Sequence, residues 1–133
     1  MMFAGKRPPN LGIREGRLAP CPNTPNCVCS QSKDAAHAIE PLTYSSAPAE
    51  AIAALKTVIE SLERTKIVTD TDTYLYTEFA SKLMGFVDDV EFYVDPAAQV
   101  IQVRSASRLG RSDLGVNRKR VELIREKLKQ SEA

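Results

Sequence analysis

The chain has 133 residues, a formal net charge of +1, 43% hydrophobic residues and 26% charged residues, which suits a single globular domain with a modest core and excludes a globally disordered chain. The nearly balanced charge produces no whole-molecule field that would attract nucleic acid. The sequence has no run of 18 apolar residues, and its basic start lacks the continuous apolar stretch of a secretory signal, so we expect a soluble cytoplasmic protein without a membrane span.

Residues 1–38 are rich in Pro, Gly, Asn and Ser and have no hydrophobic period. We therefore expect an irregular N-terminal arm over these residues and a single domain over residues 39–133. The arm contains a compact loop, residues 18–31, in which prolines stiffen the backbone and asparagines favour turns. We expect this loop to lie over the body of the domain.

The next elements are a short strand, a helix and two further strands. Pro41 confines the first strand to the edge of a sheet, because proline cannot donate a ladder hydrogen bond. The helix is predicted from apolar residues that recur on one helical face, and the two later strands from their β-branched and aromatic residues. In chain order, these elements are expected over residues 39–44, 47–64, 66–70 and 73–80.

A β-hairpin is predicted next, because Asp95 and Pro96 suit the first two positions of a type I turn. A four-residue loop over residues 96–99 places Asp95 opposite Val100. The register then pairs apolar with apolar residues and acid with base: Val94 with Ile101, Phe92 with Val103, and Glu91 with Arg104. A slip by one residue would lose these matches.

The last predicted element is a helix over residues 114–129, which Ser112 or Asp113 would cap. Its inward stripe is formed by Asn117, Val121, Ile124 and Leu128. The order of elements predicts an α+β fold. We expect a single antiparallel sheet of about four to five strands, two helices packed on one of its faces, and the irregular arm with its cysteines.

The densest group of charged side chains lies over residues 103–124, where the second strand of the hairpin leads into the last helix. Residues 104–129 contain nine bases and three acids, whereas residues 60–95 contain nine acids and three bases. We expect much of this charge to pair internally as a polar lock. In this lock, Asp88, Asp89 and Glu91 face Arg104, Arg108, Arg118 and Arg120, while Asn117 and Asp113 hold the turn. Guanidinium groups also bind carboxylates and phosphates, so we expect a shallow pocket at this lock to bind a small anionic ligand or an acidic partner segment. The candidate ligand-binding residues are Arg104, Arg108, Arg111, Asn117, Arg118 and Arg120.

The cysteines Cys21, Cys27 and Cys29 are candidate redox residues in the arm. A bridge between Cys21 and Cys27 closes a loop of roughly seven residues and stabilises the protein by about 2 kcal/mol in the chain-entropy model. The alternatives are unpaired structural thiols and a zinc site that uses His37 as its fourth ligand. A reducing cytosol disfavours the disulfide, and we expect neither a bound metal nor a cofactor.

No catalytic motif is recognisable in the sequence. His37 is the single histidine, and no Asp or Glu lies at a spacing in the sequence that identifies it as a catalytic partner. This disfavours histidine-based nucleophilic catalysis. An acid–base role for Asp88, Asp89 and Glu91 is a weaker interpretation than their pairing with arginines. A surface that binds single-stranded nucleic acid combines basic with aromatic side chains. In this sequence, the aromatic residues lie outside the basic run. We therefore expect a binding domain in preference to an enzyme, and no nucleic-acid partner.

Three motifs occur in this order along the chain: PCPNTPNCVCSQ, GFVDDVEFYVD and VRSASRLGRSDLGVNRKRVELI. Together they resemble the bacterial and plastid family called domain of unknown function 1499, over residues 18–128. The resemblance implies a single small α+β domain of unassigned activity, with no catalytic residue to carry over. The family motif usually reads CVSS where this chain has CVCS, so Cys29 is a departure from the family pattern. A description of the loop by two cysteines alone does not account for this third cysteine.

Two functions follow as expectations. The first is the binding of a small anionic ligand or an acidic protein partner at the arginine-rich strand-to-helix junction. The alternative is a redox response that uses Cys21, Cys27 and Cys29.

Overall fold

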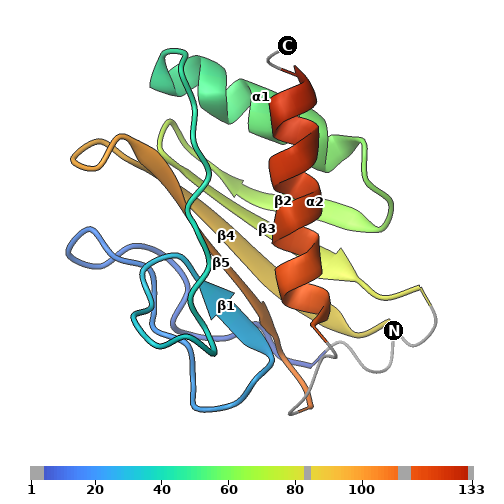
Figure 1. Cartoon of the computed structure of the whole chain (residues 1–133). Coiled ribbons are helices and arrows are strands. Elements are labelled where there is room, and N and C mark those ends of the chain that lie inside the picture. The colour runs from blue at the N-terminus through green and yellow to red at the C-terminus, as the bar shows by residue number, and fades with distance from the viewer. Residues whose placement is uncertain (1–4, 83–84, 111–114, 132–133) are drawn as a thin grey trace.

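The computed structural model describes residues 5–82, 85–110 and 115–131. These residues form one antiparallel sheet of five strands, in the spatial order β1-β5-β4-β3-β2, together with two helices (Figure 1). The elements in chain order are β1 (Cys27–Cys29), α1 (Pro48–Glu60), β2 (Thr65–Asp70), β3 (Tyr74–Ala80), β4 (Val87–Asp95), β5 (Val100–Ser107) and α2 (Val116–Ser131). The predicted α+β fold is confirmed. No helix in the described ranges is both long enough and apolar enough to span a bilayer.

Both helices pack on the same face of the sheet, and the hydrophobic core lies between them and the strands. Alternate residues of a strand point to opposite faces, so every second position of the central strands enters this core. The buried strand residues include Val90, Phe92, Val94, Ile101 and Val103. The predicted inward stripe of α2, which comprises Asn117, Val121, Ile124 and Leu128, is buried as expected.

β4 and β5 pair in the predicted register. Val94 lies opposite Ile101, Phe92 opposite Val103, and Glu91 opposite Arg104. The turn is fixed by Asp95, whose Oδ1 accepts a hydrogen bond from the amide of Ala97 at 3.0 Å. Turn chemistry and side-chain alternation are local properties, which is why the sequence predicted this hairpin correctly.

The other face of the sheet carries polar side chains and is covered by the N-terminal arm. Three contacts mark the path of the arm along this face. The guanidinium of Arg7 binds Glu78 with an Nη2–Oε2 distance of 2.8 Å. The amide of Gly12 donates to Glu91 Oε2 at 2.7 Å, and the carbonyl of Pro20 accepts a hydrogen bond from Arg104 at 3.3 Å. The sheet is therefore covered by helices on one side and by irregular chain on the other.

Two expectations about strands are wrong. β1 lies within the segment expected to be irregular and pairs with residues 104–106 of β5. Conversely, residues 39–44 do not form a strand, and Leu42 makes only an isolated bridge to Ile101. The preceding carbonyls of Glu40 and Pro41 accept hydrogen bonds from the guanidinium of Arg125, at 2.8 Å each, in place of a ladder.

The helix ends also differ from the prediction. α1 ends at Glu60, four residues earlier than expected. The hydroxyl of Thr65 bonds to the carbonyls of Ile59 and Leu62, and Arg64 has a φ of 59°, so the chain leaves the helix there and enters β2. α2 continues to Ser131, two residues beyond the expected end. The predicted caps, Ser112 and Asp113, lie outside the described residues.

Candidate functional site

The charged residues of the β5–α2 junction fall into two groups, one on each face of the sheet. Asp88 faces the helices, and its Oδ2 lies 2.8 Å from Arg120 Nη2. Asp89 faces the arm, and its two oxygens accept hydrogen bonds from Arg108 at 2.8 and 2.9 Å. Neighbouring residues of a strand point in opposite directions, so these two aspartates cannot share one site. The expected single lock is thus divided by the sheet.

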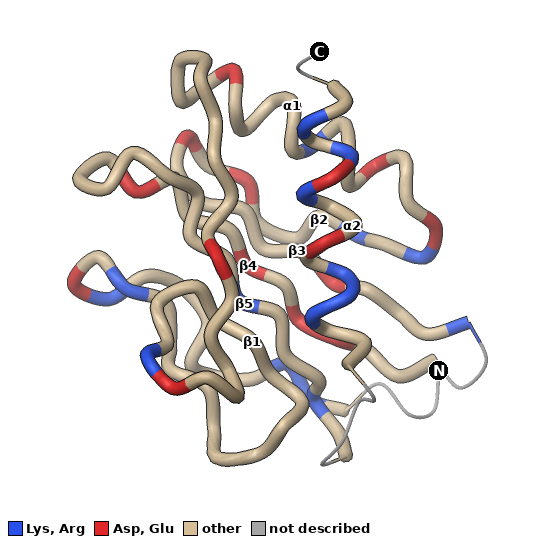
Figure 2. The backbone as a smooth tube through the Cα atoms, viewed as in Figure 1, with Lys and Arg blue, Asp and Glu red and all other residues tan. Residues whose placement is uncertain are grey.

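The remaining candidate arginines lie apart from these pairs. Arg118 donates to the backbone carbonyls of Ala38, at 2.8 Å, and Ala36, at 3.3 Å, and so ties α2 to the chain before residue 39. Arg111 and Asp113 lie outside the described residues. Figure 2 shows how Lys and Arg residues alternate with acids along α2.

Asn117 is fully buried and joins α2 to β5. Its Oδ1 accepts hydrogen bonds from Ser105 Oγ at 2.6 Å and Arg120 Nη1 at 2.8 Å. Its Nδ2 donates to Ser107 Oγ at 2.9 Å and to the carbonyl of Asn26 at 3.2 Å. These bonds occupy both ends of the amide, so Asn117 holds the junction together and is not presented to a ligand.

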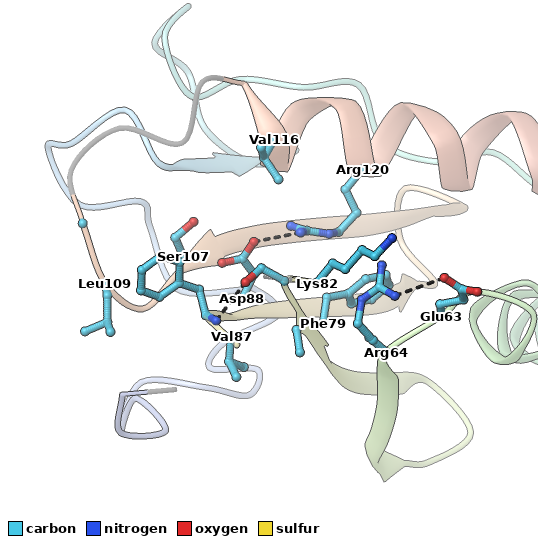
Figure 3. Close-up of a pocket in the computed structure, with 14 residues that line it drawn as sticks. Glu63, Arg64, Phe79, Lys82, Val87, Asp88, Ser107, Leu109, Val116 and Arg120 are labelled. Carbon is cyan, nitrogen blue, oxygen red and sulfur yellow. Dashed lines mark hydrogen bonds and ion pairs between the residues drawn. The ribbon is translucent and has the colours of Figure 1, made fainter. Parts of the chain in front are cut away.

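On the helix side of the sheet lies a cavity of about 580 Å³, which we call the junction pocket (Figure 3). It opens between the end of β3, the start of β4, the end of β5 and the first turn of α2. Its apolar surface comes from Phe79, Phe86, Val87, Leu109 and Val116. Its charged surface comes from Glu63, Arg64, Lys82, Asp88 and Arg120.

The apolar lining of the junction pocket is unusually exposed. Phe86, Leu109, Val116 and Leu123 are the exposed large hydrophobic residues among those the structure describes, with exposed fractions of 42–47%. The first three line the junction pocket, and Leu123 lines an adjoining hollow that shares Phe79, Val116 and Arg120 with it. Exposed apolar residues that gather at one place mark a binding surface more often than scattered ones do.

Three cations border the same pocket. Arg120 reaches over the ring of Phe79, with its guanidinium carbon 5.0 Å from the ring centroid, while it pairs with Asp88. Arg64 pairs with the exposed Glu63 at 3.0 Å. Lys82 is exposed at the rim. The pocket therefore joins an apolar wall to a positively charged border.

On the opposite side of the sheet lies a second cavity of about 410 Å³, which we call the arm pocket. Its lining comprises Lys6, Pro8, Asn10, Pro20, Cys21, Pro22, Cys27, Asp89, Arg104, Ala106, Ser107 and Arg108. The arm forms one wall, the cysteine loop a second, and the polar face of the sheet the floor.

The floor of the arm pocket belongs to a network of buried charges and hydroxyls. The hydroxyl of Tyr76 donates to Asp89, which also binds Arg108. Glu78 binds Arg108 at 2.6 Å. The pKa of Arg108 is raised, because its hydrogen bonds to Asp89 outweigh the opposing effect of burial. Burial and the bond to Asp89 likewise raise the pKa of Tyr76.

Glu91 is the most deeply buried carboxyl of this face, with an exposed fraction of 0%. Its Oε2 accepts hydrogen bonds from the amide of Gly12 and the hydroxyl of Tyr74. Among the described residues, its Oε1 has no hydrogen-bond partner, and it lies 3.9 Å from Arg104 Nη1. Burial raises the pKa of Glu91, and the hydrogen bonds from Gly12 and Tyr74 oppose this only in part.

The cysteines are divided between a disulfide and a free thiol. Cys21 and Cys27 form the disulfide, which anchors the cysteine loop to β1. Cys29 is a buried free thiol whose pKa is raised by that burial. The ring nitrogens of His37 are engaged by other groups, Asp34 at 2.6 Å and the carbonyl of Thr24 at 2.8 Å, although its backbone carbonyl accepts a hydrogen bond from the amide of Cys29 at 2.8 Å. The described residues contain no His, Cys, Asp or Glu cluster that could hold a metal ion.

Sequence reasoning missed several of these features. It did not identify Asp34 as the partner of His37, three residues away. It also missed the apolar lining and two cations of the junction pocket, which are contributed by segments between residues 63 and 116. The available signal was the presence of Phe86 and Leu109 beside glycines, next to the ends of predicted strands, where both side chains are exposed in the structure.

The chain was compared with known protein families and with curated proteins. The model of a family described as "Protein of unknown function (DUF1499)" matches residues 17–128. No curated protein matches the chain.

Proposed function

Since the chain belongs to the DUF1499 family, whose description assigns no activity, we propose from its geometry that the protein binds a small amphipathic anion in the junction pocket. The ligand would place an apolar body against Phe79, Phe86 and Leu109 and an acidic head toward Lys82 and Arg64. The observation that carries the proposal is the meeting of exposed apolar side chains and cations at one cavity.

Size and composition support a small-molecule ligand. Pockets for such ligands commonly have volumes of about 300–1,000 Å³, are mostly apolar, and contain a few polar groups that set orientation. The junction pocket, at about 580 Å³, falls within this range. An apolar body of several methylene groups would gain up to about 0.8 kcal/mol for each one that is buried.

Charge supports an anion over a cation. Asp88 is engaged by Arg120, and Glu63 by Arg64, so the two carboxylates of the lining are already in ion pairs. Lys82 adds a further positive charge at the rim, where a ligand carboxylate or sulfonate would meet it. The lining carries three cations and two anions, which favours a ligand with a single negative charge.

The test uses alkyl carboxylates of increasing length. We expect octanoate to bind about tenfold more tightly than hexanoate, because two more methylene groups are buried, and acetate to show no measurable binding. Isothermal titration calorimetry measures the affinities, and amide chemical shifts locate the site. Phe86→Ala and Lys82→Ala should each weaken octanoate binding. Lys66→Ala, on the exposed part of β2, is the matched control and should leave binding unchanged.

Two results would reject the proposal. One is the absence of chain-length dependence, with acetate and octanoate behaving alike. The other is octanoate binding that neither Phe86→Ala nor Lys82→Ala alters, because the ligand would then lie elsewhere. Both side chains are exposed, so we expect these variants to fold.

The disulfide bears on where the protein acts. Disulfides persist in oxidising compartments and are rare in a reducing cytosol. We infer that Cys21–Cys27 favours an oxidising compartment over the cytoplasmic location expected from the sequence. Fractionation of cells that produce the native protein, followed by thiol labelling, tests this inference. A reduced protein in the cytosolic fraction would reject it.

A further inference from the structure

We propose that the junction pocket continues into the adjoining hollow, and that its ligand is an anion with two apolar chains on one charged group, as in a dialkyl phosphate. This inference rests on the proposed function and narrows it, because it names the form of the amphipathic anion. It draws on the residues that the two cavities share, on the apolar residues that each has to itself, and on the place of Arg64 between them.

The two cavities are continuous. The hollow has a volume of about 470 Å³, and α2 forms one of its walls. The residues that line both the hollow and the junction pocket are Glu63, Arg64, Phe79, Val116 and Arg120. In Figure 3, Glu63 and Arg64 lie at the end of the junction pocket opposite Leu109, so the hollow extends the pocket from that end.

Each cavity has apolar residues of its own. Phe86 and Leu109 line the junction pocket alone, whereas Leu62 and Leu123 line the hollow alone. Leu123 has an exposed fraction of 47%, the largest among the exposed large hydrophobic residues that the structure describes. A single chain that lies against Phe86 and Leu109 leaves Leu123 in contact with water. The hollow therefore offers a second apolar surface, whose burial by a second chain is favourable.

This second surface follows the helix. Leu123 comes seven residues after Val116, which is two helical turns or about 10 Å along the axis of α2. Side chains at this spacing lie on one stripe of a helix. Val116 lines both cavities and Leu123 only the hollow, so the stripe leads from the junction pocket into the hollow.

Arg64 provides positive charge between the two apolar surfaces, because it lines both cavities. Among the described residues, its guanidinium donates only to Glu63, whose side chain is 83% exposed. A guanidinium offers five donors, and an exposed ion pair of this kind contributes little to stability, so Arg64 keeps donors for a ligand. An anionic group held by Arg64 has apolar surface on either side. A phosphate diester fits this arrangement, because its two chains leave one group that carries a single negative charge.

Two lysines extend the positive border into both cavities. Lys82 lines the junction pocket and Lys119 lines the hollow, and neither has an ion-pair partner among the described residues. Arg120, by contrast, is bound to Asp88 and lies over the ring of Phe79. The positive charge that a ligand would meet is thus distributed over both cavities and is not confined to the junction pocket.

The experiment compares dihexyl phosphate with hexyl methyl phosphate by isothermal titration calorimetry, using the full chain. Both diesters carry one negative charge, and they differ only in the length of the second chain. We expect dihexyl phosphate to bind about tenfold more tightly, because its second chain buries at least two further methylene groups in the hollow. Methyl resonances locate the chains. Dihexyl phosphate should shift those of Leu109 and Leu123, and hexyl methyl phosphate chiefly those of Leu109.

Two leucine variants separate the cavities. Leu123→Ser removes an apolar side chain of the hollow and should lower the affinity for dihexyl phosphate to that for hexyl methyl phosphate, while octanoate binds as it does to the wild type. Leu109→Ser should weaken the binding of all three ligands. Gln130→Ser, at an exposed position of α2 outside both cavities, is the control and should change none of the affinities. Leu109 and Leu123 are 44% and 47% exposed, so we expect both variants to fold, which their thermal unfolding midpoints check.

Two results would overturn the inference. One is an equal affinity for the two diesters, and the other is a preference for dihexyl phosphate that Leu123→Ser leaves intact. If octanoate still binds and its affinity depends on Phe86, the junction pocket remains a site for a single chain, and only the second chain is rejected. If octanoate and both diesters fail to bind, the proposed function is rejected as well.

Discussion

Asp88 and Asp89 are adjacent in sequence but lie in different surroundings. Asp88 faces the helices and pairs with Arg120, whereas Asp89 faces the arm and is held by Arg108 and Tyr76. Breaking either pair would leave a buried charge without a partner, which typically costs about 3–5 kcal/mol. At this scale, the alternation of side chains along a β-strand decides on which face each carboxyl group lies, and therefore which arginine it can pair with.

Glu91 gives a prediction about pH. Its pKa is raised in the folded protein, chiefly by burial, so its contribution to stability is fully present below about 4.3, the pKa of an unfolded glutamate. That contribution is lost as the pH rises through the pKa in the folded state. Glutamine has no such dependence and can still accept the hydrogen bonds from Tyr74 and Gly12. We therefore expect Glu91→Gln to gain stability relative to the wild type as the pH rises from 4 to 8.

Urea unfolding at several pH values measures this difference. Glu126→Gln, at an exposed position of α2, is the control and should show a nearly constant difference from the wild type. A constant difference for Glu91→Gln as well would mean that Glu91 titrates in the folded protein as it does in the unfolded chain.

At the scale of elements, the contact between α2 and β5 depends on one polar side chain. Asn117 bonds to Ser105, Ser107 and the carbonyl of Asn26, and so connects the helix, its neighbouring strand and the cysteine loop. We expect Asn117→Leu to destabilise the fold by about 3 kcal/mol, because it leaves several buried polar groups without partners. Chemical denaturation measures this loss. Gln130→Leu, at an exposed position of the same helix, should change stability by less than about 0.5 kcal/mol.

An Asn117→Leu variant as stable as the wild type would show that the network contributes little. In that case, packing of Val121, Ile124 and Leu128 alone would fix the helix on the sheet. The Asn117→Asp variant separates the two possibilities further, since it keeps the acceptor and removes the donor to Asn26 and Ser107.

The elements differ in how well the sequence predicts them. The β4–β5 hairpin follows from a local turn at Asp95 and from alternating apolar residues, so its register was predictable. The pairing of Glu91 with Arg104 followed from that register. β1 was not predictable, because three residues within a proline-rich segment carry no pattern, and their partner in β5 is more than 70 residues away. The direction of Arg118 depends on how α2 is rotated against the sheet, which periodicity alone does not fix.

The junction pocket shows the same limit. Its lining comes from the ends of β3, β4 and β5, from the start of α2, and from residues after α1. Each segment contributes one or two residues, and only the assembled fold brings them together. The arginines at the strand-to-helix junction were visible in the sequence, whereas the apolar partners that give the pocket its character were not.

At the scale of the whole molecule, the disulfide yields a prediction about thiols. In denaturant without reductant, we expect one reactive thiol from Cys29, and three after reduction. In the native protein, Cys29 should react slowly, because it is 1% exposed and its pKa is raised by burial. Reduction should lower the free energy of unfolding by about 2 kcal/mol, as expected for a short closed loop.

Thiol titration and mass spectrometry of labelled peptides measure these counts. Three thiols that react rapidly in the native, unreduced protein would contradict the disulfide. Rapid labelling of Cys29 alone would instead support the redox-responsive function considered from the sequence, since it would show an accessible thiol near a disulfide.

The arm that covers the polar face of the sheet has a consequence for the order of folding. Its contacts with Glu78, Glu91 and Arg108 join residues separated by 71, 79 and 103 positions. Such distant contacts can form only after the strands that carry them have assembled, because closing long loops is entropically costly. The arm, which precedes the strands in the chain, therefore settles after them, and the charges on that face of the sheet stay hydrated until this final step.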